Sequence, residues 1–121
     1  RCRFVQGDFF AMSASRFSGF DPENHGKKFH AILLDVDHSP RHVLHPHHKL
    51  FYQFNGLHQL TSHLLPGGVF ALWSNDSPDE RFQFALSEVF AYSKTHIVKF
   101  PNPIFHREEV STVYVAQTTI T

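Results

Sequence analysis

The sequence predicts an α/β fold built on a mostly parallel sheet. Two apolar runs, AILLDV at 31–36 and VFALW at 69–73, are separated by a segment with helical spacing and a Pro-Gly-Gly turn. Continuous apolar strands joined through a helix are typical of parallel strands that are buried on both faces. Two more strand-like segments close the chain, and their short connection favours an antiparallel hairpin.

Short apolar segments mark the predicted strands. Each segment is bounded by glycine, proline, asparagine or acidic residues, which interrupt extended structure. A loop rich in glycine, proline and charge, residues 18–28, separates the first two strands. The predicted strands are residues 3–6, 31–36, 69–73, 96–100 and 112–117.

The first predicted helices begin at capping or proline signals. Asp8 can cap a helix over residues 9–15, because its carboxylate can accept hydrogen bonds from the free amides of the first turn. Pro46 suits the first position of a second helix. Asn55 is a candidate cap for a third helix, whose apolar residues recur at helical spacing.

The last predicted helix begins at the segment SPDE, residues 77–80. This segment has the form of a capping box, in which Ser77 binds the Glu80 amide and the Glu80 carboxylate reaches back. Pro78 would occupy the first helical position. The helix is expected to continue to about Tyr92.

Composition and charge restrict the class of protein. The 121 residues suffice for one domain with a modest core, and no basic run is present that would bind a nucleic-acid backbone. No apolar stretch approaches the roughly 20 residues that span a bilayer. The single cysteine, Cys2, excludes an internal disulfide and fits a reducing compartment. We therefore expect a cytoplasmic protein with no nucleic-acid and no membrane partner, and we expect the chain to be part of a longer protein.

Four blocks of sequence resemble, in their order, the carboxyl-terminal half of a class I S-adenosylmethionine-dependent transferase domain, in particular its spermidine synthase-like branch. The resemblance covers most of the chain and implies that residues 1–121 form a single partial domain. The implied fold is a Rossmann-like class I methyltransferase sandwich with a terminal antiparallel hairpin and with the amino-terminal strands missing. The blocks are VQGDFFAM at 5–12, FHAILLDVDHSP at 29–40, LFYQFNGLHQLTSHLLPGGVFALW at 50–73 and STVYVA at 111–116.

The resemblance also implies a cofactor and a catalytic residue. The donor would be S-adenosylmethionine or decarboxylated S-adenosylmethionine, with Asp8 and Phe9 in the adenosyl site. Asp35 would position and deprotonate an attacking amine, so that an aminopropyl or related group is transferred to a small amine. The glycine-rich cofactor loop of the family falls before Arg1, and we therefore expect no tight cofactor binding by this chain alone.

Polar residues at two strand ends predict the substrate site. In open α/β sheets, ligands bind beyond the carboxyl ends of parallel strands. Asp35 lies at one such end, where a carboxylate can act as a base, although an aspartate at this position also suits a turn. The candidate substrate-binding residues are Asp37, His38, Tyr52, Ser74 and Asp76.

The same residues allow other functions. Asp35 with Asn75 or Asp76 resembles the magnesium site of catechol-type O-methyltransferases, which would make the protein a small-molecule methyltransferase. The family pattern has a second acidic residue where this chain has His38, so a catalytically silent domain that binds a ligand or partner is a further alternative. No metal is expected at a dense histidine cluster, because its spacing fits no zinc motif. The cluster consists of His38, His42, His45, His47 and His48.

The missing strands lead us to expect a homodimer. In the family sheet, two strands lie between those that match residues 3–6 and 31–36, and this chain lacks both. Unpaired strand edges leave backbone groups without partners. A second copy could complete the sheet or bury its exposed face.

Overall fold

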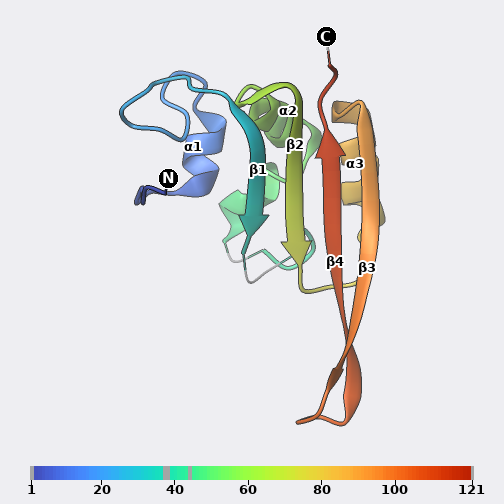
Figure 1. Ribbon diagram of the computed structural model, residues 1–121. Helices are drawn as coiled ribbons and strands as arrows, with labels where there is room; N and C mark the ends of the chain where they lie inside the picture. The colour runs from blue at the N-terminus through green and yellow to red at the C-terminus, as the bar shows by residue number, and fades with distance from the viewer. Residues whose placement is uncertain (1, 37–38, 44, 121) are drawn as a thin grey trace.

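The computed structural model describes residues 2–36, 39–43 and 45–120, which fold into helices on one side of a sheet (Figure 1). This arrangement confirms the predicted α/β class. The elements, in chain order, are α1 (Phe9–Ala14), β1 (Phe29–Asp35), the 3-10 helix η1 (Pro46–Leu50), α2 (Phe54–Thr61), β2 (Leu64–Ser74), α3 (Glu80–Val89), β3 (Tyr92–Asn102) and β4 (Arg107–Gln117).

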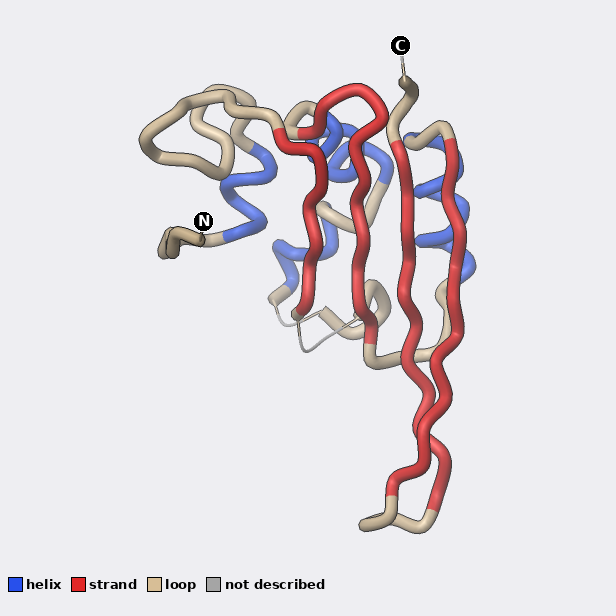
Figure 2. The backbone as a smooth tube through the Cα atoms, in the orientation of Figure 1, coloured by secondary structure: helices blue, strands red, loops and turns tan. Residues whose placement is uncertain are grey.

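The four-stranded sheet has the order β1-β2-β4-β3 (Figure 2). β1 and β2 are parallel, with Ala31 opposite Val69 and Asp35 opposite Trp73, so the predicted parallel pair is confirmed. β4 is antiparallel to both of its neighbours, and it forms the predicted terminal hairpin with β3. The expectation of a mostly parallel sheet is wrong for the described chain, because two of its three strand pairs are antiparallel.

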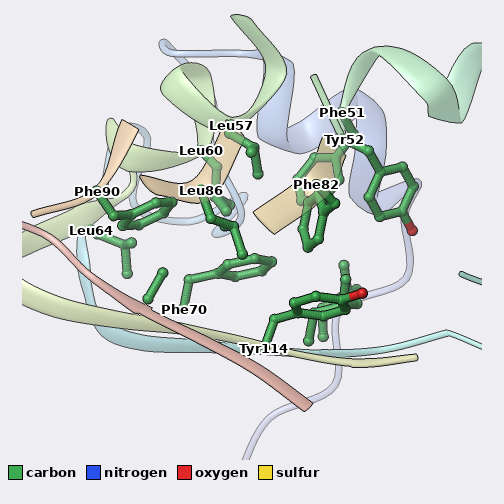
Figure 3. Close-up of a cluster of buried hydrophobic side chains, with 13 residues drawn as sticks. Phe51, Tyr52, Leu57, Leu60, Leu64, Phe70, Phe82, Leu86, Phe90 and Tyr114 are labelled. Atoms are coloured by element: carbon green, nitrogen blue, oxygen red, sulfur yellow. The ribbon is translucent and has the colours of Figure 1, made fainter. Parts of the chain in front are cut away.

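The core lies between the sheet and the helices, and aromatic rings fill much of it (Figure 3). Successive strand residues point to opposite faces of a sheet. One face of the central strands therefore supplies Phe70, Leu72 and Tyr114, which meet apolar residues of α2 and α3. The Phe82 and Tyr114 rings meet edge to face, with their centroids 4.8 Å apart.

The opposite face of the sheet has no helix over it in the part of the chain that the structure describes (Figure 1). Leu33, in the middle of β1, is 76% exposed there, and Trp73 of β2 is also exposed. The prediction that β1 is buried on both faces is therefore wrong. Only alternate residues of the apolar run in β1 pack in the core, chiefly Leu34.

The predicted first strand, residues 3–6, does not form. Residues 2–6 are exposed and have no regular secondary structure. A single extended segment cannot satisfy its own backbone groups, and the described sheet offers it no neighbouring strand. Arg3 instead binds the carboxylates of the 18–28 loop, with its Nη2 atom 2.6 Å from Asp21 Oδ1. It also pairs with Glu23.

Local signals predicted two of the helix starts correctly. Asp8 caps α1, as its Oδ1 atom accepts hydrogen bonds from the amides of Phe10 (2.9 Å) and Ala11 (3.3 Å). Pro46 is the first residue of η1, although this segment is a 3-10 helix rather than an α-helix. The Asn55 cap is wrong, because α2 starts earlier, after Gln53, and has no side-chain cap.

The capping box at residues 77–80 is also wrong, because Asp79 caps α3. Its Oδ1 atom accepts from the Phe82 amide at 3.1 Å. Arg41 donates to the Pro78 carbonyl at 3.1 Å, and the Asp79 amide donates to the Tyr114 hydroxyl at 2.9 Å. These bonds hold the preceding segment outside the helix. The helix ends at Val89, three residues before the predicted end.

Replacing Gly56 with alanine is expected to destabilise the fold. Alanine normally stabilises a helix relative to glycine by about 1 kcal/mol. In α2, however, a Cβ atom at this position would lie 2.1 Å from the Leu50 carbonyl oxygen and 2.5 Å from the Phe51 Cα. The clash is with backbone, so we expect Gly56→Ala to lower the free energy of unfolding by about 1–3 kcal/mol, measured by urea denaturation. The matched control is Asn55→Ala on the exposed side of α2, which should change stability by less than about 0.5 kcal/mol. Equal stability of the two variants would contradict the close approach.

Candidate functional site

The carboxyl ends of β1 and β2 lie side by side at one rim of the sheet (Figure 1). Asp35 is the last residue of β1, and Ser74 is the last residue of β2. The Asp35 side chain is exposed on the helix-free side and forms no hydrogen bond or ion pair with another described residue. The candidates Asp37 and His38 lie outside the described residues. Asp35 is therefore opposite Trp73 at this rim, but its side chain lies on the helix-free side, whereas the Ser74 side chain is buried toward the helices.

Asp76, in the loop that follows β2, forms hydrogen bonds with the loop that follows β1. Its Oδ2 atom accepts from Ser39 Oγ at 2.5 Å and from His42 Nδ1 at 2.7 Å. Its carbonyl accepts from Thr112 Oγ1 at 2.7 Å. The hydrogen bond from Ser39 lowers the pKa of Asp76, with a further contribution from His42, while partial burial acts in the opposite direction. Asp76 therefore has a structural role at this rim.

Ser74 contributes to the same turn rather than to an open surface. Its side chain is buried, and its Oγ atom accepts from the Asp76 amide at 3.4 Å. Sequence reasoning named Asp76 and Ser74 but missed Ser39 and His42. The signal that could have identified them is topological, because loops after adjacent parallel strands meet at the same rim.

A cavity of about 640 Å³ lies beside this rim, between the loop after β1 and the start of α3. Tyr52 forms part of its wall, and its ring packs edge to face on Phe82 with 5.5 Å between the centroids. Burial raises the pKa of Tyr52 to about 12, so its hydroxyl is a neutral donor at pH 7. In Figure 3 this hydroxyl points away from the core cluster, and it has no hydrogen-bond partner among the described residues.

Charged residues line the rest of this cavity. Arg41 is held in place by Asp79, with 3.5 Å between Nε and Oδ2, and by the carbonyls of Ser77 and Pro78. Lys49 and Arg81 also line the cavity, and within the described chain neither forms an ion pair. The cavity can therefore hold a small polar molecule, with the Tyr52 hydroxyl and these cations as donors.

A second cavity, of about 580 Å³, lies at the start of α1 beside Asp8. The Phe10 ring lines it and stacks on the His48 ring, with 3.8 Å between the centroids. Phe9, the sequence candidate, is not among the residues that line this cavity; it packs against the core, and its ring stacks on Phe20 with the centroids 5.0 Å apart. Sequence reasoning missed Phe10, because the two adjacent phenylalanines differ only in the side of the helix they occupy.

The described residues contain no group of three or more histidine, cysteine, aspartate or glutamate side chains that could hold a metal ion. The ring centroids of His45 and His47 are 4.6 Å apart, and both residues are exposed. In the magnesium alternative, Asp76 would supply an oxygen, but its Oδ2 already accepts two hydrogen bonds. Asn75 Oδ1 accepts a hydrogen bond from the Trp73 indole at 3.3 Å.

Comparisons with known proteins assign no family to the chain. No family model matches it, and a search of curated proteins found no match. None of the helices in the described residues has the length and apolar character needed to cross a membrane. The geometry of the rim and of the two cavities therefore provides the basis for a functional proposal.

Replacing Asp76 with asparagine should reduce stability in a pH-dependent way. The pKa of Asp76 is lowered in the folded state from its ordinary value of 3.8, so its stabilising contribution is present above pH 3.8 and is lost as the pH falls through the lowered value. The difference in unfolding free energy between wild type and Asp76→Asn should therefore be largest near neutral pH and should shrink in acid. Urea denaturation across this pH range measures it.

The control for this experiment is Asp35→Asn at the neighbouring strand end. The Asp35 side chain makes no hydrogen bond with a described residue, so the difference in unfolding free energy between wild type and Asp35→Asn should change little over the same pH range. If both variants showed the same pH dependence, the hydrogen bonds of Asp76 with Ser39 and His42 would not be the cause of the pH-dependent loss of stability.

Proposed function

We propose that this chain is part of a spermidine synthase-like transferase that uses an adenosyl sulfonium donor and a small amine acceptor. The observation that carries the proposal is the unpaired Asp35 carboxylate at the carboxyl rim of a parallel strand pair, in a sheet that ends in an antiparallel hairpin. The sequence blocks that resemble this family fall on these same elements. The donor would be S-adenosylmethionine or its decarboxylated form.

The cavity beside Asp8 is suited to the adenosyl group of such a donor. One carboxylate oxygen of Asp8 caps α1, and the other accepts no hydrogen bond from a described residue. This second oxygen could accept from the amino group of adenine. The Phe10 and His48 rings line the same cavity and offer flat surfaces on which a base can stack.

Asp35 would act on the acceptor amine. Its carboxylate could hold the protonated amine by a charge-assisted hydrogen bond and accept its proton. The amine nitrogen would then attack the carbon attached to the sulfonium, and the electron pair of the broken C–S bond would pass to sulfur, leaving a neutral thioether. Positioning of the two reactants would supply much of the acceleration.

The donor half of the proposal predicts weak, site-specific binding of 5′-methylthioadenosine to this chain. We expect a dissociation constant near 1 mM, about −4 kcal/mol, with amide shifts in NMR spectra confined to residues around Asp8 and Phe10. Asp8→Asn should weaken binding at least about five-fold, because asparagine caps a helix as well as aspartate but replaces the free oxygen with an amide donor. Unchanged affinity of Asp8→Asn, or shifts elsewhere in the sheet, would contradict this site.

The acceptor half predicts the effect of Asp35→Asn in the longer protein. Loss of a general base should lower turnover by about 10²–10⁴-fold, while donor binding stays intact. Steady-state kinetics at saturating donor and amine, together with donor titration, separate the two effects. Unchanged turnover would remove Asp35 from catalysis, and a wild-type protein that binds the donor without turnover would favour the catalytically silent alternative.

A further inference from the structure

We propose that the cavity lined by Tyr52, on the helix side of the sheet, binds a small organic carboxylate. This Tyr52 cavity lies between the loop after β1, the end of η1 with the residues that follow it, and the start of α3. The inference is independent of the proposed function. The Tyr52 cavity shares no lining residue with the cavity beside Asp8, and the Asp35 side chain is exposed on the opposite side of the sheet.

The Tyr52 hydroxyl is a buried donor that has no hydrogen-bond partner among the described residues. Tyr52 is only 7% exposed, and its hydroxyl points away from the core cluster (Figure 3). The hydroxyl of Tyr114, the other buried tyrosine, accepts instead from the Asp79 amide at 2.9 Å. A phenylalanine would fill the ring position of Tyr52 equally well, and an unpaired buried hydroxyl is unfavourable. The hydroxyl is therefore suited to a ligand atom in the cavity that accepts a hydrogen bond.

The charged residues of the Tyr52 cavity favour an anion that carries one negative charge. Three cations and two carboxylates line the cavity, so its lining has a net charge of +1. Arg41 and Asp79 pair with each other and are neutral together. The other three charged residues form no ion pair within the described chain, and they are Lys49, Arg81 and Glu80. One bound monoanion would balance the excess positive charge.

The start of α3 adds to this preference for an anion. The Asp79 carboxylate accepts from the Phe82 amide at 3.1 Å, whereas the amides of Glu80 and Arg81 have no acceptor among the described residues. The free amides at a helix N-terminus carry a partial positive charge. Since residues 80–82 line the Tyr52 cavity, this charge lies beside the bound ligand.

The size and the apolar walls of the cavity favour a carboxylate on an organic body. Its volume of about 640 Å³ lies within the range of roughly 300–1,000 Å³ that is usual for small-molecule sites. Pro40, Pro78 and the Tyr52 ring supply apolar surface for the body of the ligand. A carboxylate carries the single negative charge that the lining balances. A phosphate dianion would instead leave one negative charge unbalanced, in a cavity that also contains Glu80.

NMR titration of the chain with benzoate, benzamide and inorganic phosphate tests the ligand class. Benzoate joins a carboxylate to a compact apolar ring, and benzamide has nearly the same shape without the charge. We expect benzoate to shift the amide signals of residues 80–82 and Gln53 with a dissociation constant of about 1–5 mM, and benzamide to bind at least about ten-fold more weakly. Absence of benzoate binding at about 50 mM, shifts confined to other residues, equal binding of benzamide, or tighter binding of phosphate at these residues would overturn the proposal.

Three variants test the residues assigned to this site. Tyr52→Phe keeps the packed ring and should weaken benzoate binding about ten-fold, while the free energy of unfolding changes little because the hydroxyl has no described partner. Arg81→Gln should weaken binding at least about three-fold. The matched control is Lys94→Gln on β3, which removes one exposed charge outside the cavity and should leave the affinity within about two-fold. Wild-type affinity of Tyr52→Phe, or equal weakening by Arg81→Gln and Lys94→Gln, would overturn the assignment.

Discussion

The parallel pairing of β1 with β2 determines where the rest of the chain can lie. A parallel pair needs a crossover connection, and here η1 and α2 form it on one face of the sheet (Figure 1). The crossover fits in this space because Gly56 lets the backbone of α2 approach that of η1 closely. The pairing also brings the carboxyl ends of both strands to one rim, where the two following loops meet through Asp76.

Two carboxylates at this rim have opposite physical roles. Asp76 accepts hydrogen bonds from two side chains, and these bonds favour its charged form and fix it in place. Asp35, at the neighbouring strand end, is exposed and without a partner among the described residues. Because these bonds lower the pKa of Asp76, its carboxylate is a weaker base and is less able to accept a proton from an amine. The free carboxylate is therefore the one assigned to chemistry, and the bound one holds the loops that surround it.

Local sequence patterns predicted the features that depend on the apolar pattern of a segment or on its capping residues. The β1–β2 pair, the terminal hairpin and the Asp8 cap all followed from such patterns. The capping box failed because Arg41 and Tyr114, both distant in sequence, bind the segment before α3 and shift the cap to Asp79. The first strand failed because no partner strand stands beside residues 2–6. At the candidate site, the positions of the strand ends led to Asp35 and Asp76. Tertiary packing determines the contacts of Ser39 and His42 and the orientation of Phe10, and the sequence pattern alone does not predict it.

β1 carries more apolar residues than the described core buries. A sheet with one solvated face normally alternates apolar and polar residues. β1 does not alternate in this way, since Leu33 faces outward between the inward-facing Ile32 and Leu34. Trp73 and Val113 continue the outward apolar surface on β2 and β4. The apolar composition of β1 is thus typical of a strand whose two faces are both covered, while the described helices cover only one face of the sheet.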